Sequence, residues 1–442
     1  MFKVLPRLLR SLWQQDMLAT LARGAGIAFV IQATGTGLKY LTQVLLARWM
    51  GASEYGVYAY AFTWANLLSV FATLGFTTGV LRFVPEYLTK RDWAHLRGLI
   101  RRVRQLVFLA GLALALVGGL VLLFLRSPQM DVSALLLGMG LVPLLALMSV
   151  QTEMVRGTQR IALAYAPPML LQPVLALGTA FFVLKALGAL TGGATIGAFM
   201  PAVLVVVGVQ SRGLIRAVPR EAVSALPRYE TSEWLRVSLP LLLVAGSLIV
   251  LNQADILMIG MFLGPKEAGI YTAATKTAAL VSFVLVAVNA IAAPMISELH
   301  TKGDREKLQE MVSAAARWMF WPSLGATLGL VLFGGAVLGF FGPEFTEGYW
   351  ALVLLALGQL VNASVGPVGY LMSLTGHQDL SARVYGLNAL VNVGLNALLI
   401  PIWGLVGAAV ATMATMILWN VWLYGLVCRL LGIRSLAFSV LR

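Results

Sequence analysis

Residues 106–125 read LVFLAGLALALVGGLVLLFL, twenty positions without a charged side chain. A helix needs about 20 predominantly apolar residues to cross the ~30 Å hydrocarbon core of a bilayer. A second uncharged run covers residues 238–254. Only helices and closed barrels pair all their backbone groups in lipid, and the sequence lacks the alternating ten-residue strands typical of a barrel. The sequence therefore predicts a polytopic, all-α membrane protein.

The composition agrees with this class, because 59% of the 442 residues are hydrophobic and 11% are charged. A soluble globular chain carries about 25% charged residues. Residues 1–23 are basic and amphipathic, which predicts an interfacial helix at the level of the headgroups. After it we count twelve spans, at residues 24–47, 57–80, 105–125, 132–155, 161–184, 188–209, 237–262, 270–293, 319–341, 350–373, 383–400 and 404–427.

The positive charge falls almost entirely on one side of these spans. With both termini on that side, it holds 26 of the 32 Lys and Arg residues, and the opposite side holds four. Since cytoplasmic loops are enriched in Lys and Arg, both termini are expected in the cytoplasm. The net charge of +14 is then explained by orientation and anionic headgroups, and no nucleic-acid partner is expected. Lys39 and Lys276 remain, inside the spans.

An internal repeat relates the two halves of the chain. Residues 50–58, MGASEYGVY, match residues 263–271, LGPKEAGIY, and one span later residues 86–92, EYLTKRD, match residues 298–304, ELHTKGD. The register is about 212 residues, close to half the chain. Six spans per half is an even number, so the two halves enter the membrane in the same direction, as in parallel-repeat transporters.

The repeat therefore predicts two pseudo-symmetric six-helix lobes with a binding site between them, near the bilayer midplane. The expected division of the chain is an interfacial helix, an N-terminal lobe, a cytoplasmic linker, a C-terminal lobe and a cytoplasmic tail, at residues 1–23, 24–209, 210–236, 237–427 and 428–442.

These segments resemble a known family, the polysaccharide transporters or Wzx-type oligosaccharide flippases of the multidrug/oligosaccharidyl-lipid/polysaccharide exporter superfamily. The resemblance rests on residues 50–58, 82–87, 255–271, 294–304 and 401–409, which together sample most of the chain. It implies a V-shaped fold of two helical lobes. It also implies flipping of an undecaprenyl-diphosphate-linked oligosaccharide from the cytoplasmic to the outer leaflet of a bacterial inner membrane, for surface polysaccharide assembly.

Ionisable residues inside spans are functional candidates by default, because inserting one costs roughly 2.5–3.5 kcal/mol at the membrane centre. Three are clear, Lys39 in span 1, Asp255 in span 7 and Lys276 in span 8, and Arg48 lies at the outer end of span 1. Several amides are spaced three or four residues from these groups or from one another, as on one helix face. The amides singled out as candidates are Gln32, Gln43, Asn66, Asn252, Asn388 and Asn392.

Two interpretations of these residues remain open. In the first, Lys39, Lys276 and Arg48 form a cationic cavity for a diphosphate, since lysine is a common phosphate partner, and the amides hold sugar hydroxyls. In the second, one lysine forms a buried ion pair with Asp255, and the amides are interhelical hydrogen bonds worth ~0.6 kcal/mol each. Asp255 could also carry a coupling proton. His95 lies in a charged loop and is expected to be solvated.

Three functions compete: a flippase working by alternating access, a drug or cation antiporter of the same superfamily, and a membrane polysaccharide polymerase. The in-span balance of two lysines to one aspartate favours an anionic substrate. No P-loop or metal-ligand spacing is present, so neither catalytic residues, metal nor cofactor are expected. The expected partners are a lipid-linked oligosaccharide, membrane lipids and the polysaccharide polymerase or export machinery, with the protein active as a monomer.

Overall fold

The computed structural model describes residues 5–124 and 131–437, and no side chains for residues 5–25, 28 and 290. Within those ranges the chain forms helices and no strands. The elements are α1 Leu5–Ala72, α2 Phe76–Lys90, α3 Trp93–Phe124, α4 Val132–Gly157, α5 Ile161–Ala166, the π-helical turn η1 Pro167–Leu171, α6 Gln172–Leu187, α7 Gly192–Ala217, α8 Arg220–Ser224, α9 Thr231–Phe262, α10 Pro265–Lys302, α11 Arg305–Gly339, the 3₁₀ turn η2 Pro343–Gly348, α12 Tyr349–Ser364, α13 Val368–Leu374 and α14 Gln378–Leu431. The interfacial helix expected at 1–23 lies outside the described side chains.

Two of the long helices contain a break at a glycine. Gly51 in α1 has φ 73° and ψ 172°, and Gly404 in α14 has φ 58° and ψ −133°. The Tyr55 hydroxyl donates a 2.8 Å hydrogen bond to Oε1 of Gln43, twelve residues earlier. Twelve residues of continuous helix would separate their Cα atoms by about 18 Å. The chain therefore turns back on itself at Gly51.

The described helices are long and apolar enough for a multi-pass membrane protein. Eight of them meet the length and hydropathy of a membrane span, or up to ten if each of two bent helix pairs is one span. In this count α14 is one helix although it is broken at Gly404, and α1 is one helix although it is broken at Gly51. The expected count of twelve stays a prediction.

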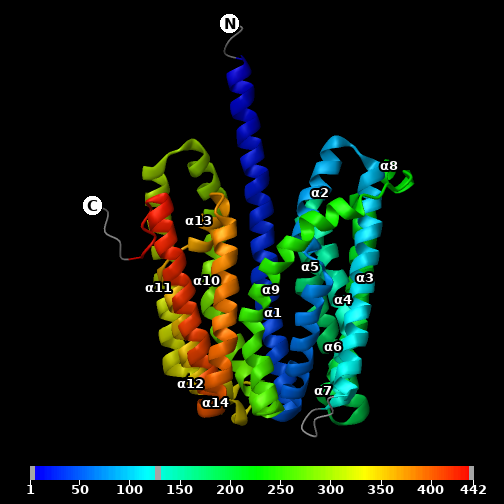
Figure 1. Cartoon of the computed structure of the whole chain (residues 1–442), viewed down its shortest axis with the longest axis vertical. Helices are drawn as coiled ribbons and strands as arrows, with labels where there is room; N and C mark the ends of the chain where they lie inside the picture. Colours follow the sequence, from blue (N-terminus) through cyan, green and yellow to red (C-terminus); the bar gives the residue numbers. More distant parts are fainter. Residues whose placement is uncertain (1–4, 125–130, 438–442) are drawn as a thin grey trace.

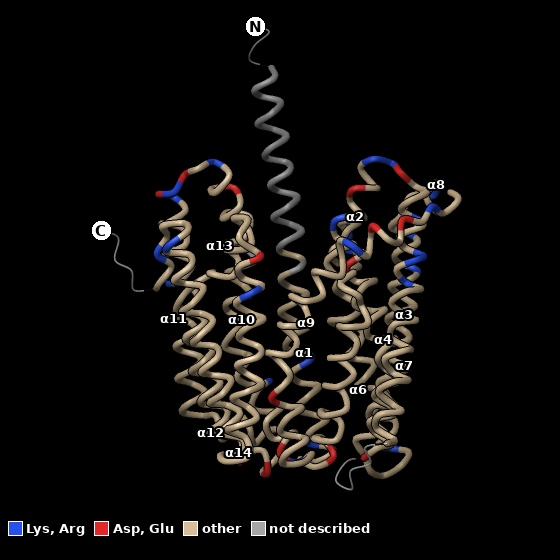
Figure 2. The backbone as a smooth tube through the Cα atoms, viewed as in Figure 1, with Lys and Arg blue, Asp and Glu red and all other residues tan. Residues whose placement is uncertain are grey.

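The helices form two lobes (Figure 1). Helices α2 to α7 lie on one side and α10 to α14 on the other, with the first part of α1 and α9 between them. The lobes lie apart at the end where α2 meets α3 and α10 meets α11, and come together at the other end. Most Lys and Arg residues drawn in Figure 2 lie at the first of these ends. We call it the basic end and the other the opposite end.

Helix α9 passes from one lobe to the other. Near the basic end it packs on α2, where a methyl group added at Gly79 would lie 2.2 Å from Oγ of Ser238. Further along, Asp255 of α9 accepts a 3.4 Å hydrogen bond from Thr412 of α14. The first half of the helix is thus attached to the N-terminal lobe and the second half to the C-terminal lobe.

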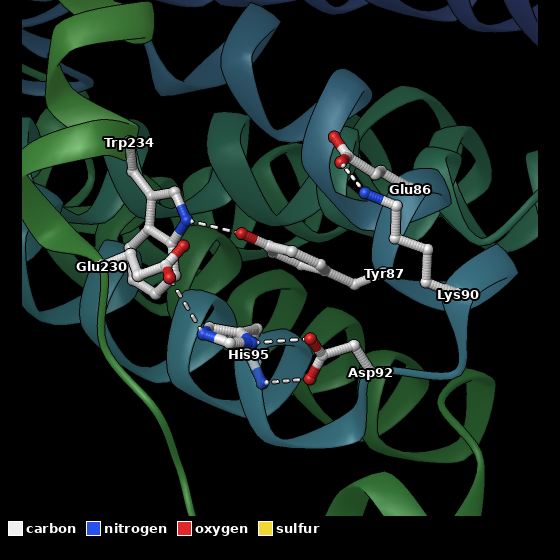
Figure 3. A network of polar contacts seen from close by, with 7 residues as sticks. All are labelled: Glu86, Tyr87, Lys90, Asp92, His95, Glu230 and Trp234. Carbon is white, nitrogen blue, oxygen red and sulfur yellow. Dashed lines mark hydrogen bonds and ion pairs between the residues drawn. The ribbon is translucent and has the colours of Figure 1, made fainter.

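The connection leading into α9 is held against the N-terminal lobe by a polar network (Figure 3). His95 at the start of α3 bridges two carboxylates, with Nδ1 2.6 Å from Asp92 Oδ2 and Nε2 3.2 Å from Glu230 Oε1. Trp234 also reaches α2, through the Tyr87 hydroxyl. The expectation that His95 is solvated is wrong, because its side chain is 12% exposed and packs against the Tyr87 ring. Residues 228–234 thus fold back onto α3, a contact that no pattern in the sequence indicates.

Candidate functional site

A cavity of about 400 Å³ lies where the two lobes face each other, in the range of typical ligand sites. One wall comes from α1, α4, the η1 turn, α6 and α7 of the N-terminal lobe, and the other from α10 of the C-terminal lobe. A second space of about 310 Å³ lies towards the basic end, between α1, α2, α4 and α9, and includes Thr73, Thr77 and Asn252. Two cavities thus follow each other from the middle of the molecule towards the basic end.

Both in-span lysines line the central cavity. Lys39 comes from α1 and is half-buried, and Lys276 comes from α10 and is exposed within the space between the lobes. Among the described residues neither ammonium group forms an ion pair with a carboxylate. Two cations that share one cavity and form no ion pair there attract an anion.

The ion pair considered between a lysine and Asp255 does not form in this conformation. The Asp255 carboxylate is buried, accepts a 2.8 Å hydrogen bond from the Tyr271 hydroxyl and accepts another from the backbone N–H of Ile256 at 2.9 Å. Together with Thr412, these donors satisfy both carboxylate oxygens without a cation. The two lysines are therefore available to a ligand.

Amides and aromatic rings complete the central cavity. Of the predicted amides, Gln43 and Asn66 line it. Gln172, Tyr58 and Phe199 also line it and were not singled out from the sequence. Of these three residues, only Gln172 stands in a local setting that points to a functional site. It lies between the π-helical turn Pro167–Leu171 and Pro173, and π turns are frequent at functional sites.

The Tyr58 side chain is buried and its ring forms part of the aromatic lining of the cavity. Its ring packs 5.6 Å from Phe62 and 5.5 Å from Phe199, and all three residues line the cavity. The faces of these rings suit the apolar face of a sugar.

A second, smaller cavity of about 60 Å³ lies within the C-terminal lobe. Asp255, Asn252 and Asn388 line it, and Asp255 is the single titratable side chain on its described lining. The Oδ1 atom of Asn388 and the Oε1 atom of Gln359 are buried there without a donor. The cavity is therefore rich in oxygen acceptors.

The remaining candidates lie elsewhere. Asn392 donates a 3.1 Å hydrogen bond to Oγ1 of Thr415, which matches the interhelical role considered for that stripe. Gln32 is half-buried and lines none of these cavities, and Arg48 is exposed and also lies outside them. Within the described part of the chain no three His, Cys, Asp or Glu side chains gather in a metal-binding group.

Comparison with known proteins identifies a family and relatives for this chain. The family model for polysaccharide biosynthesis proteins matches residues 21–300. A probable low-salt glycan biosynthesis flippase of Haloferax volcanii, Agl15, is 28% identical over 159 residues, which are 36% of this chain and 34% of the relative. The match thus spans about a third of the length of that curated relative.

Solved structures share the fold at low sequence identity. The lipid II flippase MurJ in an inward closed conformation superposes with a TM-score of 0.70 at 15% identity, over 90% of this chain and 86% of MurJ. A multidrug resistance MATE family transporter of the MOP superfamily, facing inward, superposes with a TM-score of 0.67 at 15% identity, over 92% and 99%. The predicted two-lobed helical fold is confirmed by these likenesses. This chain belongs to the polysaccharide biosynthesis protein family and has the membrane fold of the MOP superfamily transporters.

Proposed function

We propose that this protein is a flippase for an undecaprenyl-diphosphate-linked oligosaccharide, which it moves between leaflets by alternating access of its two lobes. The observation that carries the proposal is the pair of ammonium groups, Lys39 and Lys276, facing one cavity from opposite lobes without a carboxylate partner. A diphosphate supplies the missing negative charge. Gln43, Asn66 and Gln172 then provide donors and acceptors for sugar hydroxyls.

The relatives support the same class. The curated relatives include two proteins named as probable flippases, and the structural neighbours include a flippase and a transporter. We therefore infer a transporter and not a membrane polymerase. The antiporter alternative is weaker, because the central cavity presents cations to its ligand.

The proposed direction follows from charge. The basic end carries the loops at 82–104 and 302–317, and positive loops favour the cytoplasm. We propose that this end faces the cytoplasm of a bacterium and that the substrate enters from the inner leaflet. The single native cysteine, Cys428, lies near the end of α14 and offers a direct test. A maleimide that cannot cross the membrane should label it in inverted vesicles and not in intact cells.

Asp255 is proposed as the coupling residue. Its carboxyl group is buried in the small cavity of the C-terminal lobe, where it accepts hydrogen bonds from Tyr271 and Thr412 and forms no ion pair with either lysine. A group that gains and loses a proton there would change the packing of α9 against α14. This would link the proton gradient to the arrangement of the lobes.

The decisive experiment is deletion of the gene followed by mass spectrometry of the lipid-linked sugars. A flippase predicts that one undecaprenyl-diphosphate oligosaccharide accumulates with its sugar facing the cytoplasm, and that complementation removes it. An unchanged lipid-linked pool, together with increased drug resistance on overexpression, would identify an antiporter instead. A pool accumulating on the outer face would indicate a polymerase.

A further inference from the structure

The two copies of the sequence repeat meet each other at the opposite end. The first glycine of each copy, Gly51 and Gly264, stands directly before a helix. Their φ angles are positive, 73° and 114°, and their ψ angles are 172° and 178°. This combination is essentially open to glycine alone. The repeat therefore preserves a backbone geometry as well as a sequence, and the two helices it begins run next to each other.

The second glycine of each copy forms the contact between them. A methyl group added at Gly56 would lie 1.7 Å from the carbonyl oxygen of Pro265, and one added at Gly269 would lie 2.5 Å from the carbonyl oxygen of Ala52. Each motif thus buries its glycine against the start of the other motif. Small residues allow helix backbones to approach this closely in a membrane. No larger side chain fits at either position while the lobes remain in this arrangement.

Aromatic and polar contacts between the lobes lie between this helix crossing and the central cavity, on the side of the cavity that faces the opposite end. We call these contacts the cavity floor. The Tyr40 hydroxyl is 3.1 Å from Oγ1 of Thr277, and its ring packs 5.7 Å from Phe341. The Tyr55 ring packs 5.7 Å from Phe345. Tyr40 lines the cavity, so these contacts separate it from the opposite end.

A charged group holds the outermost part of the contact. The carboxylate of Glu344, in the 3₁₀ turn before α12, accepts a 3.0 Å hydrogen bond from the backbone N–H of Ala52. That N–H belongs to the first turn after the break at Gly51, where helices leave donors unpaired. The negative charge of Glu344 is also stabilised by the positive N-terminal end of the helix dipole. It therefore joins the C-terminal lobe to the start of the N-terminal motif.

We propose that the two repeat motifs form the outer gate of the transporter, closed here by mutual burial of Gly56 and Gly269. Opening to the outside requires these two glycines to separate, and the cavity floor formed by Tyr40 and Thr277 separates with them. The proposal rests on the alternating access of the proposed function, and it assigns the gate to the repeat itself. A larger residue at either glycine opposes closure and favours the conformation open at the opposite end.

The test measures distances between spin labels in lipid nanodiscs, without substrate, in a Cys428→Ser background. One label pair at Ser53 and Thr346 reports the opposite end, and a second at Thr89 and Thr301 reports the basic end; all four positions are exposed. Gly56→Ala and Gly269→Ala should each lower the ratio of closed to open outer gate about tenfold, a shift of about 1.4 kcal/mol. The distance at the basic end should shorten in the same samples.

The matched control is Gly197→Ala, because a methyl group there meets no atom within 4 Å. It should keep the wild-type distances at both ends. If a glycine variant fails to insert, Glu344→Gln replaces it, since it removes the charged acceptor of Ala52 and leaves the helix crossing free of added bulk. It should shift both distances in the same directions by a smaller factor.

Two results would overturn the gate. One is wild-type distances in all three variants, and the other is a longer distance at the opposite end without shortening at the basic end. These results are independent of what is transported. Reciprocal distance changes in a protein that leaves the lipid-linked sugar pool unaffected would refute the proposed function and leave the gate standing.

Discussion

The indole Nε1 of Trp234 donates a hydrogen bond of 3.0 Å to the hydroxyl of Tyr87, and so ties the start of α9 to α2. Trp234 is fully buried. Nearby, the backbone N–H of Arg228 donates a 3.0 Å hydrogen bond to the carbonyl oxygen of Ala94, and a methyl group at Gly98 would lie 1.7 Å from the carbonyl oxygen of Arg228. The connection between the halves therefore moves with the N-terminal lobe.

The first prediction concerns this attachment. Trp234→Phe removes the donor and leaves the Tyr87 hydroxyl with one partner fewer, which costs about 1–3 kcal/mol at a buried site. Hydrogen exchange of residues 225–237 should become about tenfold faster or more. Tyr87→Phe removes the same bond from the other side, so the double variant should add little to either single change. Fully additive effects would mean that the bond does not hold the connection.

The second prediction concerns acid pH at the same place. Burial alone would raise the pKa of Asp92, but hydrogen bonds from the side chain and backbone of His95 lower it below its ordinary value. A carboxyl whose pKa is lowered by folding stabilises the fold above its unfolded pKa, about 3.9 for aspartate, and this stabilisation is lost as pH falls through the folded value. Hydrogen exchange at the α2–α3 turn should therefore accelerate below about pH 4.

Asp92→Asn separates this effect from general acid unfolding. The variant has no carboxylate at position 92 to accept from Nδ1 of His95, so its turn should exchange faster already at neutral pH and show a smaller further change on acidification. Glu230→Gln is the companion control, since Glu230 faces the other ring nitrogen of His95. An acid response of the same size in Asp92→Asn as in the wild type would contradict the assignment.

The fold could be predicted because the hydropathy and charge patterns that determine it are visible in the sequence without knowledge of tertiary contacts. Uncharged runs such as 106–125 leave few alternatives to a membrane helix, and the repeat between 50–58 and 263–271 indicates two lobes. The breaks at Gly51 and Gly404 show why the exact limits of the spans were harder to predict. Helical hydrogen bonding continues on both sides of each break, so the local sequence does not mark where one span ends and the next begins. Residue boundaries in such places depend on tertiary packing.

The site was predictable where charge singled residues out, or where amides such as Gln43 and Asn66 follow one helix face. Lys39 and Lys276 had no topological reason to lie in spans, and they line one cavity. Arg48 satisfied the same criterion by charge but lies exposed at the end of a span. Tyr58 and Gln172 were missed because neither carries a charge and neither belongs to a stripe of polar residues at helical spacing. Whether such a residue faces a cavity or packs between helices depends on partners far away in the chain.

The third prediction tests the cavity lysines. Lys39→Ala and Lys276→Ala should each reduce export of surface polysaccharide about 10- to 100-fold, the loss expected when a charged hydrogen bond of about 1.5–3 kcal/mol is removed. Arginine at either position should restore part of the activity, because it keeps the charge with a different geometry. Protein levels in the membrane should stay unchanged, as neither lysine forms an ion pair among the described residues.

The matched control is Lys185→Ala, at the end of α6 and outside all three cavities. Its ammonium group lies 5.7 Å from the Phe181 ring, so the change costs a surface contact and no cavity charge. It should export normally. Full export by the Lys39→Ala/Lys276→Ala double variant would exclude a cationic cavity as the binding site.

The fourth prediction concerns Asp255 and the driving force. Asp255→Asn keeps the size of the side chain and an acceptor for the Tyr271 hydroxyl, so the protein should insert and fold. It removes the single titratable group on the described lining of the small cavity. In proteoliposomes containing a fluorescent lipid-linked sugar, the wild type should flip faster when a pH difference is imposed. The variant should flip at the rate that the wild type shows without the difference.

Tyr271→Phe distinguishes coupling from packing. This change deletes a hydrogen bond to the same carboxylate and leaves Asp255 able to exchange a proton. If the carboxyl couples the proton gradient, Tyr271→Phe keeps a response to the pH difference and Asp255→Asn loses it. If Asp255 serves only to pack α9 against α14, both variants lower the rate and both keep the response. A pH-dependent Asp255→Asn variant would therefore place coupling at another residue.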